Sequence, residues 1–189
     1  MDSKHTGSFG DYAVFSFNGN KIITSGGGGA IASRHKDNFE RAKFVSRTAK
    51  EPHAWDFYHS EVGFNYRMPA LNASFLSSQL KHLDKILENK RKTAAAYREF
   101  FSNIEGAQFV DEPPGAKSNF WLNSVIMNSE KDRDSLLQEC HEHKVGARPL
   151  WKCIHTLPMY KGYCAENLEN AMDLQARVVS LPSSYREGQ

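Results

Sequence analysis

The chain has 189 residues, with 24 Lys and Arg against 22 Asp and Glu, which gives a formal net charge of +2. Hydrophobic residues at 40% and charged residues at 24% are typical of globular proteins and argue against disordered, collagen-like and coiled-coil classes. The near-neutral charge argues against nucleic acid as a partner, and no apolar run approaches the ~20 residues of a membrane span. Three cysteines and no signal-peptide pattern favour a cytoplasmic α/β or α+β protein without disulfides.

The first readable elements are two short strands that flank a loop. Residues 12–17 are apolar and aromatic, which predicts a buried strand, and residues 30–32 predict a second one. Between them lie the turn signal Asn18-Gly19-Asn20 and a run of four glycines at positions 26–29. Asp37 and Asn38 then offer N-caps for a helix that ends near Val45, and residues 50–69 predict an irregular excursion.

The strongest periodic signal predicts a long helix over residues 70–103. Leucines at positions 76, 80, 83 and 87 follow spacings of four, three and four, and an apolar stripe continues to position 104. We expect this stripe to lie in the core. Lys90 interrupts it, which predicts a kink or a change of packing partner there.

Strands and helices alternate in the last part of the chain, after Pro113-Pro114-Gly115. Strands are expected over residues 120–127, 145–150 and 178–181, and helices over residues 130–141 and 167–177. This alternation predicts a small α/β layer with helices on one face of its sheet.

Lys21 is the first candidate for chemistry, because it lies in a tight turn directly after an aromatic strand. A lysine held near apolar surface can act as a nucleophile toward aldehydes. The competing interpretation is an ordinary surface lysine, which composition alone would favour. Both interpretations stay open on the residues around Lys21.

Two further patterns give weaker indications. The glycines at 26–29 could let backbone N–H groups approach a phosphate, but neither the P-loop nor the G-x-G-x-x-G spacing is present, and close strand packing explains them equally well. Cys140, Cys153 and Cys164 lie more than ten residues apart, although structural zinc sites favour paired ligands. We therefore expect no metal site.

Three segments in a fixed order resemble one known family. They are F-S-F-N-G-N-K-I-I-T-S-G-G-G-G at residues 15–29, G-F-N-Y-R-M at residues 63–68, and A-R-P-L-W-K at residues 147–152 with P-M-Y at 158–160 and L-P-S-S at 181–184. The first resembles the active-site segment of the DegT/DnrJ/EryC1/StrS aminotransferases, pyridoxal phosphate enzymes that aminate nucleotide-linked keto sugars. The other two are similar to that family's later motifs. Within the family, the sequences of these segments are most similar to those of 4-aminotransferases of the legionaminic-acid and bacillosamine type.

The resemblance implies a cofactor role for three residues of the first segment. Lys21 matches the lysine that holds pyridoxal phosphate covalently and then moves a proton between substrate and cofactor. Ser16 matches the serine that binds the cofactor phosphate. Asn18 stands where the family often has His and would lie beside the cofactor.

The later segments imply a partner subunit and a substrate. Asn65 matches the asparagine that reaches the cofactor phosphate of the neighbouring subunit, which implies a homodimer with shared sites. Arg148 and Trp151 are expected to face the nucleotide sugar. The family resemblance also implies an amino-acid donor such as glutamate and a UDP-4-keto-6-deoxy-hexose type of substrate.

The resemblance further implies a fold: the C-terminal part of a fold-type I, aspartate aminotransferase-like enzyme. Residues 1–88 would close a large cofactor domain and residues 89–189 would form a small α/β domain, joined by the long helix. Members of the family have roughly twice this length, so we expect little aminotransferase activity from this polypeptide alone. The alternatives are a non-catalytic remnant and one half of a split enzyme that acts through a partner.

Overall fold

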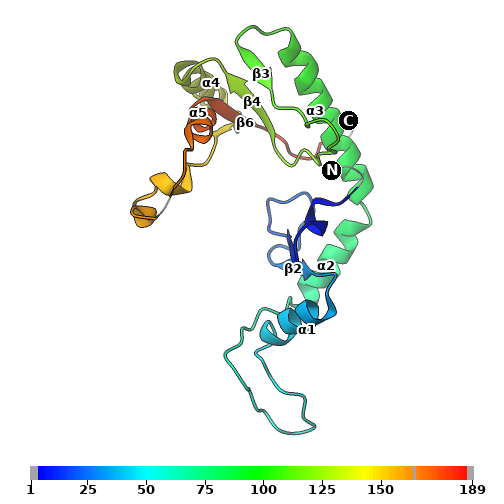
Figure 1. Cartoon of the computed structure of the whole chain (residues 1–189). Helices are drawn as coiled ribbons and strands as arrows, with labels where there is room; N and C mark the ends of the chain where they lie inside the picture. Colours follow the sequence, from blue (N-terminus) through cyan, green and yellow to red (C-terminus); the bar gives the residue numbers. More distant parts are fainter. Residues whose placement is uncertain (1–3, 164, 187–189) are drawn as a thin grey trace. The chain divides into compact units, whose positions relative to one another are not determined.

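The computed structural model describes residues 4–163 and 165–186, so Cys164 and the ends of the two expected domains lie outside the description (Figure 1). The chain forms two compact units. Unit 1 comprises Met1–Lys85 and Gly115–Lys117, and unit 2 comprises Ile86–Pro114 and Ser118–Gln189. The structure is mixed α/β, as the sequence predicts.

Unit 1 is built on a two-stranded antiparallel hairpin. Strands β1 (Ala13–Ser16) and β2 (Gly29–Ala32) pair from Ala13 opposite Ala32 to Ser16 opposite Gly29. A 3-10 helix, η1 (Thr6–Ser8), precedes them. Side chains of β1 alternate between half-buried and exposed, as expected for a strand with one covered face. Both strands are confirmed as strands, but the expectation that the first is buried is wrong, because no residue of β1 is buried and Val14 is 77% exposed.

Helix α1 (Lys36–Val45) follows the hairpin, but it begins earlier than predicted. Its N-cap is His35, whose side chain makes no capping hydrogen bond, so the expected caps at Asp37 and Asn38 are wrong. Asp37 lies instead within the first turn, where its negative carboxylate interacts favourably with the positive end of the helix dipole. Asp is common both at the N-cap and in the first turn of a helix, so the sequence alone does not separate the two positions.

The excursion after α1 is irregular, as predicted, yet it is held by specific contacts. Isolated backbone bridges join Arg47 to Asn65 and Lys50 to His59. Arg41 on α1 pairs through both terminal guanidinium nitrogens, Nη1 and Nη2, with the Glu61 carboxylate, and Nη2 lies 2.7 Å from Oε2. This hydrogen-bonded pair lowers the pKa of Glu61.

The single long helix predicted over residues 70–103 is two helices. Helix α2 (Ala70–Leu80) ends in a turn in which the Lys81 and His82 amides donate to Ser78 and Gln79 carbonyls three residues back. Helix α3 (Leu83–Ser102) then begins. Tightened i→i+3 bonds are a common way to end a helix, and the leucine spacing continues across the break.

Helix α3 runs without a break through Lys90, which is buried. Its ammonium donates to the carbonyl oxygens of Ser183 and Trp121, the latter at 3.5 Å. Burial lowers the pKa of Lys90, because the charged form is disfavoured away from water. The position that interrupts the apolar stripe therefore makes a polar contact from α3 to the backbone at Trp121 and Ser183.

The apolar stripe lies in the core only along α3. Ala94 is fully buried, and Tyr97 and Phe101 pack against the core of unit 2. No residue of α2 is buried, and Leu80 is 48% exposed. The expectation that the whole stripe is core is wrong for α2, because amphipathic spacing does not say whether a partner covers the apolar face.

Unit 2 contains a four-stranded antiparallel sheet. The strands β3 (Ala107–Phe109), β4 (Asn123–Met127), β5 (Arg148–Pro149) and β6 (Val178–Leu181) lie in the order β3-β4-β6-β5. Helices α4 (Glu130–Glu142) and α5 (Glu169–Arg177) and the short helices η2 (Ile154–Thr156) and η3 (Pro158–Tyr160) complete the unit. The predicted strand over residues 145–150 is reduced to two residues, and β3 was not predicted because three residues carry no readable pattern.

The core of unit 2 centres on the two middle strands. Val125 and Val179 face each other in register and are fully buried, and Leu181 and Ala147 join them. Side chains from α3 and α4 pack against this cluster. Helix α4 begins at the N-cap Ser129, whose hydroxyl accepts the Asp132 amide at 3.1 Å.

No helix in the described part of the chain is long and apolar enough to cross a membrane.

Candidate functional site

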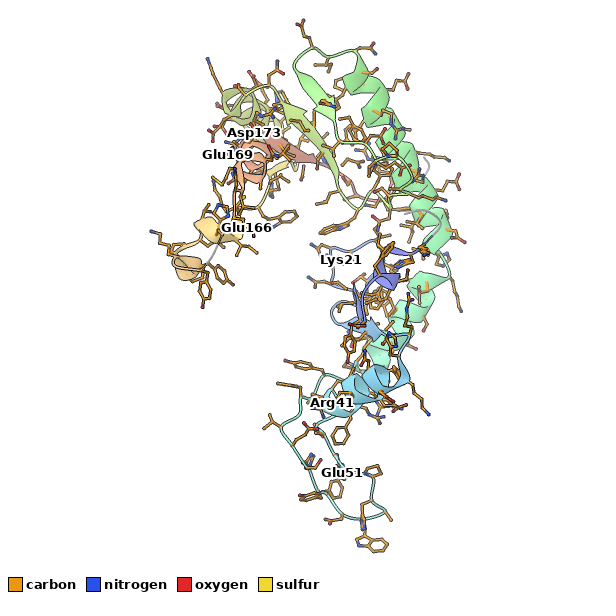
Figure 2. The ribbon with its side chains drawn as sticks, viewed as in Figure 1. Lys21, Arg41, Glu51, Glu166, Glu169 and Asp173 are labelled. Atoms are coloured by element: carbon orange, nitrogen blue, oxygen red, sulfur yellow. The ribbon has the colours of Figure 1, made fainter. Side chains whose placement is uncertain are left out.

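The predicted cofactor residues of the first segment lie at the end of β1 and in the loop that joins it to β2, where Figure 2 labels Lys21. Ser16 ends β1, and Lys21 lies in a turn in which its amide donates to the Asn18 carbonyl at 3.0 Å. The Phe17 amide extends the strand pairing by donating to the Gly28 carbonyl at 3.0 Å. The hairpin therefore places Ser16 at the end of β1, with Asn18 and Lys21 in the turn that follows it.

Hydrogen bonds within unit 1 hold this loop in place. The Phe17 carbonyl accepts the Ser25 amide at 3.0 Å and the Thr24 hydroxyl at 3.1 Å. Ser25 is 2% exposed, and Asn72 of α2 donates to its carbonyl at 2.5 Å. Lys21 is half-buried within this framework, which removes much of the freedom of an ordinary surface lysine.

The glycine run is explained by backbone geometry. Gly26 and Gly28 have φ values of 79° and 96°, which side-chain-bearing residues rarely adopt. A Cβ on Gly29 would come within 2.5 Å of the Phe15 carbonyl oxygen, so the strands pack too closely there for any side chain. The Gly26 amide donates to the Thr24 hydroxyl at 2.9 Å, so this N–H group already has a partner within the loop.

Asn65 lies at a separate feature of unit 1. It is exposed and lines a surface hollow of about 750 Å³ with Arg67 and residues at the start of α2. The residues that line this hollow do not include Ser16, Asn18 or Lys21. The amino end of α2 carries unpaired N–H groups and a positive dipole end, and Arg67 adds a full charge, so the hollow suits an anion.

The predicted substrate residues lie in unit 2. Arg148 is on β5, opposite Ser180 of β6, and its Nη1 donates to the Ala147 carbonyl at 2.8 Å. Trp151 follows β5, is 69% exposed, and stacks on Trp121 with ring centroids 6.4 Å apart and planes 21° apart. Trp121 was not predicted from the sequence, because nothing in the Asn119-Phe120-Trp121 segment indicates a partner thirty residues further along.

The polar groups of the loop fit pyridoxal phosphate by their chemistry. Lys21 supplies an amine for the cofactor aldehyde, and the Ser16 hydroxyl, exposed and without a hydrogen bond to any described residue, can donate to a phosphate oxygen. Among residues 4–163 and 165–186, no group of three or more His, Cys, Asp or Glu side chains is arranged to hold a metal ion. Cys140 and Cys153 are free thiols.

A comparison with protein families matches residues 1–186 to the DegT/DnrJ/EryC1/StrS aminotransferase family. The chain belongs to this family. Pyridoxal phosphate is the cofactor of the DegT/DnrJ/EryC1/StrS enzymes, and a relative from Bacillus subtilis named "Putative pyridoxal phosphate-dependent aminotransferase EpsN" is 36% identical over 184 residues, which are 95% of this chain and 47% of that protein. The expected family, fold class and family cofactor are confirmed.

Individual relatives of this DegT/DnrJ/EryC1/StrS chain are similar over about half of their own length. GDP-perosamine synthase from Vibrio cholerae is 36% identical over 166 residues, which are 85% of this chain and 44% of that protein. GDP-perosamine synthase from Escherichia coli O157:H7 is 29% identical over 180 residues, 95% of this chain and 48% of that protein. The solved aminotransferase TlmJ from Streptoalloteichus hindustanus has a TM-score of 0.90 at 24% identity and covers 97% of this chain and 49% of its own.

Proposed function

We propose that this chain carries the lysine-bearing part of a cytoplasmic aminotransferase that converts a nucleotide-linked keto sugar to an amino sugar in surface-polysaccharide or glycan biosynthesis. The observation that carries the proposal is the anchored β1–β2 loop, which presents Lys21 between Ser16 and buried Ser25. The relatives named GDP-perosamine synthase and UDP-4-amino-4,6-dideoxy-N-acetyl-beta-L-altrosamine transaminase support it by their names. Within this class, we propose a UDP-4-keto-6-deoxy-hexose type of substrate with glutamate as the amino donor.

The roles of the loop residues follow from their chemistry. Pyridoxal phosphate supplies an electron sink for the substrate carbon when it is bound. Lys21 would hold the cofactor through its Nζ atom, and its amine would also serve as the base that moves the substrate proton. The Ser16 hydroxyl would donate to a phosphate oxygen, and the Asn18 side chain would lie beside the cofactor.

Asn65 is proposed to act on the cofactor of a neighbouring subunit, which makes the active form a homodimer with shared sites. Its support is that the hollow lined by Asn65 and Arg67 suits an anion yet includes no residue of the Lys21 loop. The Asn65 amide would donate to a phosphate oxygen, and the amino end of α2 would add its dipole. Neither nucleic acid nor a membrane is part of this proposal.

The units are assigned corresponding roles. We propose that residues 1–88 belong to the cofactor domain and residues 89–189 form the small domain. Arg148 and Trp151 are exposed in unit 2, and we assign them to the nucleotide sugar because a guanidinium binds phosphate and an indole stacks on planar rings.

Covalent trapping tests the proposal directly. The full chain is incubated with pyridoxal phosphate, reduced with borohydride and digested, and the peptides are mapped by mass spectrometry. We expect the reduced pyridoxyl group on the peptide that contains Lys21, because this amine is held at the loop that binds the cofactor. Lys21→Ala should lose the label, and Lys36→Ala, a change of an exposed lysine in the same unit, should keep it.

Two results would contradict the proposal. One is a label spread over several lysines with none enriched at Lys21. The other is labelling of the Lys21→Ala variant to the level of the unchanged chain. Retained helical circular dichroism in both variants excludes loss of folding as the reason for a missing label.

One observation favours a second candidate, in which the chain is half of a split enzyme. Unit 1 exposes apolar side chains on its hairpin and on α2, with Val14 at 77% and Leu71 at 82%. Glutamate-dependent formation of 2-oxoglutarate separates the two candidates. Label at Lys21 without any 2-oxoglutarate supports a half that needs a second polypeptide, and stoichiometric 2-oxoglutarate supports a self-sufficient enzyme.

A further inference from the structure

The loop that carries Lys21 closes on the backbone of a single residue. Phe17, the first residue after β1, has a carbonyl that accepts the Ser25 amide at 3.0 Å and the Thr24 hydroxyl at 3.1 Å. Residues 18–24 lie between Phe17 and Ser25, and Lys21 is in the middle of that stretch. The position of Ser25 therefore helps to set the shape of the stretch that presents the lysine.

Ser25, which closes this loop, is tied in turn to helix α2. It is 2% exposed, and its carbonyl accepts the side-chain amide of Asn72 at 2.5 Å, 47 residues further along the chain. Ser25 thus uses its N–H group toward Phe17 and its carbonyl toward Asn72. Because a buried carbonyl without a donor is costly, this hydrogen bond holds the loop against the start of α2.

Met68, the residue before Pro69 and α2, also packs against the loop. A Cβ added to Gly28 would lie 3.1 Å from Met68 Cε, and a Cβ added to Gly26 would lie 3.7 Å from Asn72 Nδ2. The two side chains therefore approach the glycines of the loop closely. The hydrogen bond from Asn72 lies within a packed contact and is not an isolated link across solvent.

The type of residue at position 72 fits a role as a hydrogen-bond donor. Asn72 lies in the first turn of α2, where an acidic side chain would interact favourably with the helix dipole. A carboxylate, however, only accepts hydrogen bonds, whereas the NH2 group of an Asn side chain donates to a carbonyl. The need for a donor to the Ser25 carbonyl explains an amide in place of an acid.

We propose that Asn72 is a positioning residue for Lys21: its hydrogen bond to the Ser25 carbonyl holds the loop in the shape that presents the Lys21 amine to the cofactor aldehyde. The proposal rests on the proposed function and adds to it a residue that acts on the lysine through the loop. Small displacements of a reacting group are costly, because reaction needs the two atoms in a defined geometry.

Ser16, the proposed phosphate ligand, is held independently of Asn72. It ends β1 and pairs with Gly29 of β2. Loss of the Asn72 hydrogen bond should therefore slow the reaction of Lys21 and leave the affinity for the cofactor largely unchanged. This separation of rate from affinity distinguishes positioning from a general loss of structure.

Timed quenching of the full chain with borohydride, over a series of pyridoxal phosphate concentrations, measures both quantities. The Lys21 amine forms a carbon–nitrogen double bond with the aldehyde and releases water, and borohydride reduces that bond to a stable label. Asn72→Asp keeps the size of the side chain but removes the donor. The limiting rate of Lys21 labelling should fall on the order of tenfold, and the half-saturating concentration should change by less than about twofold.

Leu71→Asp is the matched control, because it adds the same charge to the same turn at a side chain that is 82% exposed. It should label Lys21 at the rate of the unchanged chain. Asn72→Ala removes the donor without adding a charge and should show the same slowing as Asn72→Asp. Hydrogen exchange of the Ser25 amide should rise in both Asn72 variants and not in Leu71→Asp, and this measurement needs no cofactor.

Failure of the positioning role is distinguishable from failure of the proposed function. A labelled Lys21 with equal limiting rates in the unchanged chain and both Asn72 variants overturns the positioning role alone. Equal slowing in Leu71→Asp, or a rise in the half-saturating concentration as large as the fall in rate, also overturns it. A Lys21 that stays unlabelled in the unchanged chain overturns the proposed function, and the positioning role with it.

Discussion

The two units of this chain differ in how much of themselves they bury. In unit 2, Val125 and Val179 have no exposed surface, and the four residues of β6 are all buried. In the described part of unit 1, the buried residues are Ile23, Ser25 and Ala49, and neither α1 nor α2 has a buried residue. Unit 2 is therefore stabilised by a packed core, and unit 1 by a hairpin and its hydrogen bonds.

This difference matters because the candidate chemistry lies in the unit with the smaller core. The Lys21 loop is shaped by backbone hydrogen bonds at Phe17 and Ser25 and by Asn72, each of which is sensitive to local change. Unit 2, in contrast, has a packed core around Val125 and Val179 and also exposes Trp151. The candidate site is therefore shaped by local hydrogen bonds and not by a large packed core.

The largest expected effect comes from truncating a buried leucine of unit 2, and the same truncation at an exposed leucine of unit 1 is its control. Leu181→Ala removes a side chain that is 7% exposed in the core of unit 2, and we expect the free energy of unfolding to fall by about 2–5 kcal/mol. Leu71→Ala removes a side chain that is 82% exposed on α2, and we expect a change within about 0.5 kcal/mol. Urea unfolding followed by circular dichroism measures both. A similar loss for the two variants would show that α2 is covered in solution.

An intermediate effect is expected at the hairpin of unit 1. Gly29→Ala places a Cβ within 2.5 Å of the Phe15 carbonyl oxygen, which forces β1 and β2 apart and should cost about 1–3 kcal/mol locally. Hydrogen exchange of the β1 and β2 amides should rise, and pyridoxyl labelling of Lys21 should fall. Gly27→Ala is the matched control, because a Cβ there meets nothing within 4 Å. Unchanged exchange in Gly29→Ala would refute the close packing of the two strands.

The smallest effect concerns the ion pairs that join α3 to the segment after β3. Hydrogen bonds from Arg91 lower the pKa of Glu112, and those from Arg98 lower the pKa of Asp111. A carboxyl with a lowered folded pKa stabilises the fold above its unfolded pKa and loses that contribution as the pH falls through the folded pKa. Because Arg91 and Glu112 are partly exposed, Glu112→Gln should cost less than about 1 kcal/mol at pH 7.

The pH dependence gives this last prediction its sign. The difference in unfolding free energy between the unchanged chain and Glu112→Gln should shrink as the pH falls below the ordinary carboxyl pKa of 4.5. Urea titrations at pH 7 and in acid measure it. A difference that grows in acid would mean that the Arg91 pair does not favour the ionised carboxylate.

Local sequence determined the features that depend on neighbours along the chain. The β1–β2 hairpin, the loop that carries Ser16, Asn18 and Lys21, and helix α4 all follow from turn residues, alternation and short-range hydrogen bonds. Motifs within single segments also identified the family. These features are local because a turn or a cap is satisfied by groups only a few residues away.

Only the tertiary structure decided which groups far apart in sequence come together. It ended α2 at Leu80, turned Lys90 from a break in the stripe into a buried contact with Ser183, and brought Trp121 under Trp151. The apolar stripe of α2 and that of α3 look alike in sequence, yet only α3 is covered. A helical stripe records that a face can be buried, and whether it is buried depends on what packs against it.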